Sequence, residues 1–104
     1  MQKEFITITL ADDDEDDRLF FQDAFEELKI NTNVSTCNDG VELMEYLSKP
    51  ETILPNILFL DLNMPRKNGF ECLLDIRKDP KYKDIAIAIY STSSSEEDIE
   101  NTFV

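Results

Sequence analysis

The stretch that decides the fold is Ile57-Leu-Phe-Leu-Asp61-Leu-Asn-Met-Pro65. Its run of large apolar residues suits a strand that is covered on both faces, as in a parallel α/β sheet. Asp61 stands at the carboxyl end of this run, and Pro65 stops the strand. Because open α/β sheets bind ligands beyond the carboxyl ends of their strands, Asp61 is a candidate functional carboxylate.

Strand-like and helix-like segments alternate along the whole chain. The patterns predict strands at 5–10, 33–37, 57–60 and 85–90. They predict helices from Asp14 or Glu15 to about Leu28, from the Asp39-Gly-Val-Glu42 capping box to Pro50, from the Asn68-Gly-Phe-Glu71 cap to Pro80, and from Ser94 through Phe103. The expected apolar faces of the first three helices are Phe21, Ala24, Phe25 and Leu28; Val41, Met44 and Leu47; and Phe70, Leu73, Leu74 and Ile76. This alternation predicts an α/β fold with a flavodoxin-like parallel sheet of strand order 2-1-3-4, in three α/β/α layers.

Length and composition narrow the class of protein. A chain of 104 residues predicts a single domain over residues 1–104. The net charge of −13 argues against direct contact with nucleic acid or an anionic membrane, and the absence of His excludes His-based catalysis and His-ligated zinc. Cys37 and Cys72 are interpreted as buried thiols, and a single disulfide between them is the alternative that the sequence leaves open. With an N-terminal apolar stretch too short for a signal peptide or membrane span, we expect a cytoplasmic protein.

Acidic residues follow two predicted strands that would be neighbours in the sheet. Asp12 and Asp13 follow the first strand, as Asp61 ends the third. Three carboxylates at one edge repel each other, and Mg²⁺ would relieve this while favouring phosphoryl chemistry with an Asp nucleophile. The simpler interpretation, acids at a solvated helix N-terminus, fits Asp14–Asp17 better than Asp12 or Asp13. Ser91, the first residue after the fourth strand, has a hydroxyl suited to a phosphoryl oxygen.

Three segments together resemble the receiver domains of bacterial two-component response regulators. They are Ala11-Asp-Asp-Asp14, the run Leu60-Asp61-Leu-Asn63-Met64-Pro65 followed by Asn68-Gly69, and Ile89-Tyr-Ser91-Thr92-Ser93. The run Ser91-Thr-Ser-Ser-Ser-Glu-Glu-Asp-Ile99 is similar to stand-alone bacterial receivers, some of which serve phytochrome-type kinases. The resemblance covers essentially the whole chain in the right order.

The resemblance implies a phosphoacceptor protein rather than an enzyme, apart from its own phosphorylation and dephosphorylation. A sensor histidine kinase, a phosphotransfer protein or a small phosphodonor would supply the phosphoryl group, with Mg²⁺ as cofactor. The resemblance implies that Asp61 is the phosphoacceptor and a metal ligand, that Asp13 binds the metal directly, that Asp12 binds it largely through water, and that Asn63 binds it through its main-chain carbonyl. It also implies that Ser91 is the switch residue and that Thr92 lines the site. Met64 and Pro65 would shape the loop, and Gly69 would allow the turn into the helix.

Two features of such receivers have no counterpart before Val104. These are the Lys that ends the fifth strand and the switch aromatic on that strand; Lys81 and Lys83 lie in the wrong loop to substitute. We therefore expect a receiver truncated before its fifth strand. The fourth strand would then have an exposed edge, which predicts a homodimer through that edge or by domain swapping.

Three alternatives remain open. One is a receiver-derived protein-binding module that no longer takes phosphate usefully. A second is a Mg²⁺-dependent phosphatase of the haloacid-dehalogenase type, although Asn63 stands where that family needs a second Asp. The third is a calcium loop built on Asp12, Asp14 and Asp16, but Asp17 occupies the position of its required Gly.

Overall fold

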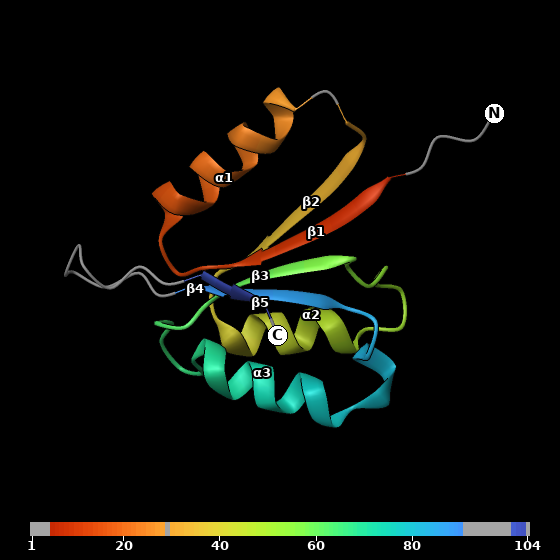
Figure 1. Ribbon diagram of the computed structural model, residues 1–104. Coiled ribbons are helices and arrows are strands. Elements are labelled where there is room, and N and C mark those ends of the chain that lie inside the picture. The colour runs from red at the N-terminus through yellow and green to blue at the C-terminus, as the bar shows by residue number, and fades with distance from the viewer. Residues whose placement is uncertain (1–4, 29, 91–100, 104) are drawn as a thin grey trace.

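The computed structural model describes residues 5–28, 30–90 and 101–103 (Figure 1). Within these residues the elements are β1 (Ile6–Ala11), α1 (Glu15–Glu27), β2 (Thr32–Cys37), α2 (Gly40–Ser48), β3 (Ile57–Asp61), α3 (Gly69–Lys78), a short 3-10 helix (Pro80–Tyr82), β4 (Ala86–Tyr90) and β5 (Asn101–Phe103). The strands form one sheet in the order β2-β1-β3-β4-β5. The first four run parallel, which confirms the predicted α/β fold and the order 2-1-3-4.

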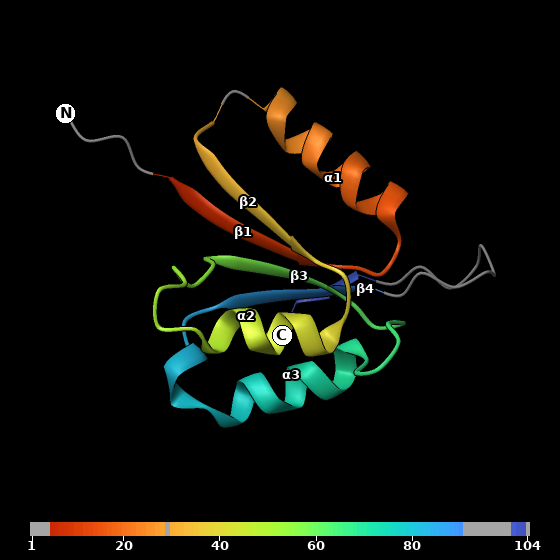
Figure 2. The same ribbon diagram turned by 180° about the vertical axis from the view of Figure 1, so that it is seen from behind.

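Helices cover both faces of the sheet. Figures 1 and 2 show α1 on one face and α2 with α3 on the other, as the three-layer prediction required. The main apolar core lies between the sheet and the α2–α3 layer. Its largest fully buried members are Leu43, Leu47, Leu58, Leu60, Ile76 and Ile87. The apolar run of β3 was therefore correctly interpreted as a strand with little contact with water.

The predicted apolar faces of α1 and α3 are only partly confirmed. On α1, Phe21 and Phe25 pack against Phe59 of β3, with ring centroids 4.9 and 6.3 Å from that ring. Ala24 and Leu28 are exposed instead, and α1 has no fully buried residue. Phe21 and Phe25 therefore give α1 its aromatic contact with β3.

On α3 the buried stripe is Cys72, Leu73 and Ile76. Phe70 and Leu74 are 56% and 47% exposed, so their assignment to the core face was wrong. Both lie outside the narrow stripe that this helix turns toward α2 and the sheet, because spacings of three and four residues define one face of a helix. The predicted stripe was wider than the one that the sheet can cover.

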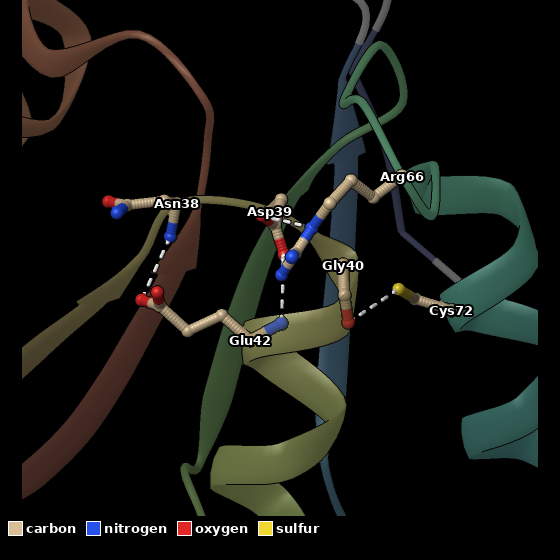
Figure 3. Close-up of polar contacts among 6 residues, drawn as sticks. All are labelled: Asn38, Asp39, Gly40, Glu42, Arg66 and Cys72. Carbon is tan, nitrogen blue, oxygen red and sulfur yellow. Dashed lines mark hydrogen bonds and ion pairs between the residues drawn. The ribbon is translucent and has the colours of Figure 1, made fainter.

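The helix caps follow the sequence closely, with one difference. Asn68 and Glu71 form a reciprocal capping box at the start of α3, as predicted. At α2 the Asp39 side chain accepts a hydrogen bond from the Glu42 amide at 2.8 Å, but the Glu42 side chain accepts from the Asn38 amide (Figure 3). The predicted box at α2 is therefore an N-cap whose second bond is displaced by one residue.

The predicted fourth helix is wrong at its carboxyl end. Asn101–Phe103 form β5, which pairs antiparallel with β4 so that Ala88 faces Phe103. The start of that predicted helix, residues 94–100, lies outside the described residues. An open strand edge carries backbone groups that need partners, and β5 supplies them along Ala88–Tyr90. The expectation of a wholly exposed β4 edge, on which the predicted homodimer depended, is therefore not met along these residues.

Candidate functional site

The site lies at the edge of the sheet where β1, β3 and β4 end. Asp12 follows β1, Asp61 is the last residue of β3, and Tyr90 is the last residue of β4. Asp61 and Tyr90 are partners in the strand register. One carboxylate oxygen from each of Asp12, Asp13 and Asp61 lies within 4.8 Å of the other two. The structure thus brings together the three acids that the sequence predicted to converge.

Two of these three carboxylates are removed from water. Asp12 is 1% exposed and Asp61 is 0% exposed, whereas Asp13 is exposed. The Asp61 Oδ1 atom accepts a hydrogen bond from the Asn63 amide at 2.9 Å. Burying like charges together is unfavourable unless a cation or hydrogen-bond donors compensate them.

Both carboxylate oxygens and the main-chain carbonyl of Asp12 accept hydrogen bonds. Its Oδ1 atom accepts from the Asp14 amide at 2.9 Å, and its Oδ2 atom accepts from the Tyr90 hydroxyl at 2.6 Å. Its main-chain carbonyl accepts from the Arg18 guanidinium at 2.7 Å. Burial, followed by this bond to Asp12 and by the charges of Asp12 and Asp61, raises the pKa of Tyr90, so its hydroxyl remains a donor. The carboxylate orientation is therefore set before any ligand arrives.

The rest of the acidic cluster belongs to the start of α1. Asp14 is the N-cap and accepts from the amides of Asp16 and Asp17. The pKa of Asp17 is raised by partial burial first and then by the carboxylates of its acidic neighbours, Asp12 foremost. The prediction that Asp14–Asp17 form an acidic helix N-terminus is confirmed, and the strand before them rules out the helix–loop–helix frame of a calcium loop.

The donor set suits a hard divalent cation. Three carboxylates, two of them buried and one at the rim, offer only oxygen atoms, which are the ligands that Mg²⁺ and Mn²⁺ accept alongside water. The main chain of Asn63 lies beside Asp61, since its amide bonds to that carboxylate. The residues present therefore fit a divalent cation.

The loop from β3 to α3 is shaped by its packing. Met64 is 6% exposed and belongs to the main core, while Pro65 is exposed. A Cβ atom on Gly69 would lie 2.3 Å from the Asp61 carbonyl oxygen. Gly69 does not have a positive φ, so the reason for glycine is this close approach rather than the turn conformation that the sequence suggested.

Arg66 is a residue of this loop that sequence reasoning missed. It has a φ of 64°, an uncommon left-handed conformation for a residue with a side chain. Its guanidinium bonds to Asp39 at the start of α2, with Nε 3.0 Å from Oδ2 (Figure 3). The Glu42 amide first, and then Arg66, hold the pKa of Asp39 below its usual range against the opposing effect of burial. The ion pair thus ties the loop after Asp61 to the α2 N-terminus.

The remaining predicted residues divide into two groups. Ser91 and Thr92 lie outside the described residues. Lys81 and Lys83 lie in and just after the 3-10 helix that precedes β4, at the opposite end of that strand from Tyr90. The prediction that neither lysine serves as the cation of the site is therefore confirmed.

Sequence reasoning gave Tyr90 no role of its own beyond its place in a motif. A phenol at the end of a strand was the signal that could have identified it as a site residue.

No described helix is both long enough and apolar enough to cross a membrane.

Comparison with known proteins places this site in a family. The response regulator receiver domain family matches residues 8–104. Response regulator Rcp1 of Synechocystis sp. is 30% identical over 96 residues, which cover 88% of this chain and 65% of Rcp1. The probable methanogenesis regulatory protein FilR2 of Methanothrix harundinacea is 27% identical over 99 residues, which cover 92% of this chain and 64% of that protein. The chain thus spans slightly less than two thirds of both curated relatives.

Solved structures agree with the sequence matches. The Mn²⁺-bound form of response regulator Rcp1 superposes with a TM-score of 0.80 at 29% identity, covering 88% of this chain and 69% of that one. The phosphorylated cyanobacterial phytochrome response regulator RcpA superposes with a TM-score of 0.81 at 34% identity, covering 90% and 70%. The family match over residues 8–104, on a fold and an acidic edge of the expected kind, shows that the chain belongs to the response regulator receiver domain family.

Proposed function

We propose that this receiver domain accepts a phosphoryl group on Asp61 in a two-component signalling pathway. The observation that carries the proposal is the position of the buried Asp61 carboxylate, within 4.8 Å of the Asp12 and Asp13 carboxylates at the carboxyl end of β3. A sensor histidine kinase or a phosphotransfer protein in the cytoplasm would be the donor. The family membership supports this class of partner.

Mg²⁺ is the proposed cofactor. Asp13 and Asp61 would bind it directly, Asp12 largely through water, and Asn63 through its main-chain carbonyl. When bound, the cation would offset the negative charge on the phosphoryl oxygens. The acidic, all-oxygen donor set supports this assignment, as does the relative described in a Mn²⁺-bound form.

The chemical step is a displacement at phosphorus. A carboxylate oxygen of Asp61 attacks, the new O–P bond forms, and the bond from phosphorus to the donor nitrogen of a phosphohistidine breaks. The leaving imidazole keeps the electron pair of that bond and takes a proton from solvent. The Asn63 amide, 2.9 Å from Asp61 Oδ1, would keep the carboxylate oriented during the attack.

Phosphorylation would be read out after β4. Ser91 is proposed as the switch hydroxyl that bonds a phosphoryl oxygen, with Thr92 lining the site and Met64, Pro65 and Gly69 shaping the loop opposite. A new charge-assisted hydrogen bond of this kind reorders a loop in many switches. Tyr90, the register partner of Asp61, immediately precedes Ser91 in the chain.

The decisive experiment is phosphorylation with acetyl phosphate. The wild-type chain is incubated with acetyl phosphate and Mg²⁺, and peptide mass spectrometry locates the added phosphate. We expect modification at Asp61, its loss when EDTA removes the cation, and its loss in Asp61→Asn. Asp23→Asn is the matched control, because Asp23 is an exposed carboxylate on α1.

Two results would contradict the proposal. Phosphate on another residue would assign the chemistry elsewhere. A folded wild-type chain that binds Mg²⁺ but stays unmodified would instead favour the receiver-derived binding module that no longer takes phosphate.

A further inference from the structure

The Tyr90 hydroxyl makes a contact that spans the site. It donates to Asp12 Oδ2 at 2.6 Å, joining residues 78 positions apart in the chain. Tyr90 ends β4 and Asp12 follows β1, so the bond crosses the end of the intervening strand β3, where Asp61 lies. A bond this short to an ionised carboxylate is of the charge-assisted kind, roughly twice as strong as one between neutral groups.

The bond fixes how Asp12 can act. With Tyr90 on Oδ2 and the Asp14 amide on Oδ1, each carboxylate oxygen of Asp12 accepts one hydrogen bond from the described part of the chain. The carboxylate is 1% exposed, so water does not replace these donors freely. Each oxygen keeps a second lone pair, and one oxygen lies within 4.8 Å of ligand atoms of Asp13 and Asp61.

We propose that Tyr90 is a positioning residue for the cation site, whose hydroxyl holds the Asp12 carboxylate ready for a divalent cation or its bound water. Donors that orient a ligand from outside the coordination sphere commonly govern metal affinity. Because Tyr90 ends β4, the same bond links occupation of the site to the strand end that precedes Ser91. This inference rests on the proposed function and adds a residue to it.

The test compares Mg²⁺ affinity in Tyr90→Phe and in the wild-type chain, without any phosphodonor. The substitution keeps the ring and removes only the hydroxyl. We expect the dissociation constant, measured by calorimetry or NMR titration, to rise about tenfold, the lower end of the range for lost orienting partners. Tyr46→Phe is the matched control, because its hydroxyl bonds to Ser35 Oγ at 3.2 Å and should leave the affinity unchanged.

Two further measurements separate positioning from a general loss of structure. In an Asp12→Asn background, Tyr90→Phe should change the Mg²⁺ affinity less than twofold, since its partner has lost the charge. In the wild-type chain, the ring NMR signals of Tyr90 should shift during the Mg²⁺ titration while those of Tyr46 stay constant. This second readout needs no variant and remains valid if Tyr90→Phe folds poorly.

The outcomes distinguish this inference from the proposed function. A wild-type chain that binds Mg²⁺ and is phosphorylated, beside a Tyr90→Phe chain of equal Mg²⁺ affinity, would overturn the inference alone. Tyr90 ring signals that ignore Mg²⁺ in such a wild-type chain would do the same. A wild-type chain that binds no divalent cation would overturn both.

Discussion

Replacing Gly69 with alanine tests whether the α3 N-terminus is seated against Asp61 as the structure shows. The new Cβ atom would lie 2.3 Å from the Asp61 carbonyl oxygen and 2.9 Å from the Asp61 carbonyl carbon. Real Cβ contacts essentially never fall below 3.0 Å, so helix and strand must separate by about 0.7 Å. The obstacle is main chain, which cannot rotate away as a side chain would.

The expected change opposes what helix propensity alone predicts. Alanine gains up to about 1 kcal/mol over glycine within a helix. Forced overpacking costs about 1–3 kcal/mol, and a 2.3 Å approach to main chain belongs in the upper half of that range, so after the gain from alanine we expect the free energy of unfolding to fall by roughly 1–2 kcal/mol. For a domain of this size, each kcal/mol lost from the free energy of unfolding lowers Tm by about 4–8 °C.

The same separation of α3 from β3 should also displace the Asp61 carboxylate. Asp61 carries both the obstructing carbonyl and the carboxylate, and misplacing a reacting group by about 1 Å can reduce a rate about a hundredfold. We expect phosphorylation by acetyl phosphate to slow roughly tenfold or more in Gly69→Ala. Calorimetric or circular dichroism melting measures the first effect, and phosphate incorporation below Tm measures the second.

Lys78→Ala is the control for the added alanine. Lys78 is an exposed residue in the last turn of α3, so the stability change of Lys78→Ala should stay within about 0.5 kcal/mol and its phosphorylation should equal that of wild type. A Gly69→Ala chain with unchanged or raised Tm would refute the close approach. A lower Tm with an unchanged phosphorylation rate would refute the link from this contact to Asp61.

Three further predictions concern the neighbouring loop and the thiols. Arg66→Ala loses the ion pair with Asp39 and keeps the left-handed backbone, whereas Arg66→Gly loses the same pair and relieves the backbone strain. Urea unfolding should therefore show the Gly variant to be more stable than the Ala variant by about 1 kcal/mol. Equal stabilities would contradict the strain at Arg66. The lowered pKa of Asp39 contributes stability that is fully present above the unfolded pKa of about 3.9 and is lost as pH falls through the lower folded pKa. The stability advantage of wild type over Asp39→Asn, measured by urea unfolding, should therefore shrink below about pH 4. An advantage that grew on acidification would contradict the lowered pKa. Burial raises the pKa of Cys37 to about 12 and the pKa of Cys72 to about 11. Mass spectrometry should therefore find both thiols unmodified by iodoacetamide at pH 8 until denaturant is added. Rapid labelling of the native chain would instead show that the thiols are accessible.

The predicted strands and helices were mostly right because their signals are local. Apolar runs marked β1, β3 and β4, and the capping residues Asp39 and Asn68 marked the starts of α2 and α3. The prediction failed at Phe103, where a helical spacing of apolar residues was outweighed by the unpaired edge of β4. Edge pairing depends on where another strand lies, which a short window of sequence does not contain.

By itself, the sequence determined that Asp12, Asp13 and Asp61 meet at one edge of a parallel sheet. Each acid follows a recognisable strand, and parallel strands end on the same side, so the convergence follows from local pattern and topology. Only the tertiary structure decided how the acids are held there. The bond from Tyr90 to Asp12 joins positions 78 apart, and the seat of Gly69 against the Asp61 carbonyl depends on how closely α3 approaches β3. Such contacts are fixed by the packing of whole elements, and no spacing along the chain encodes them.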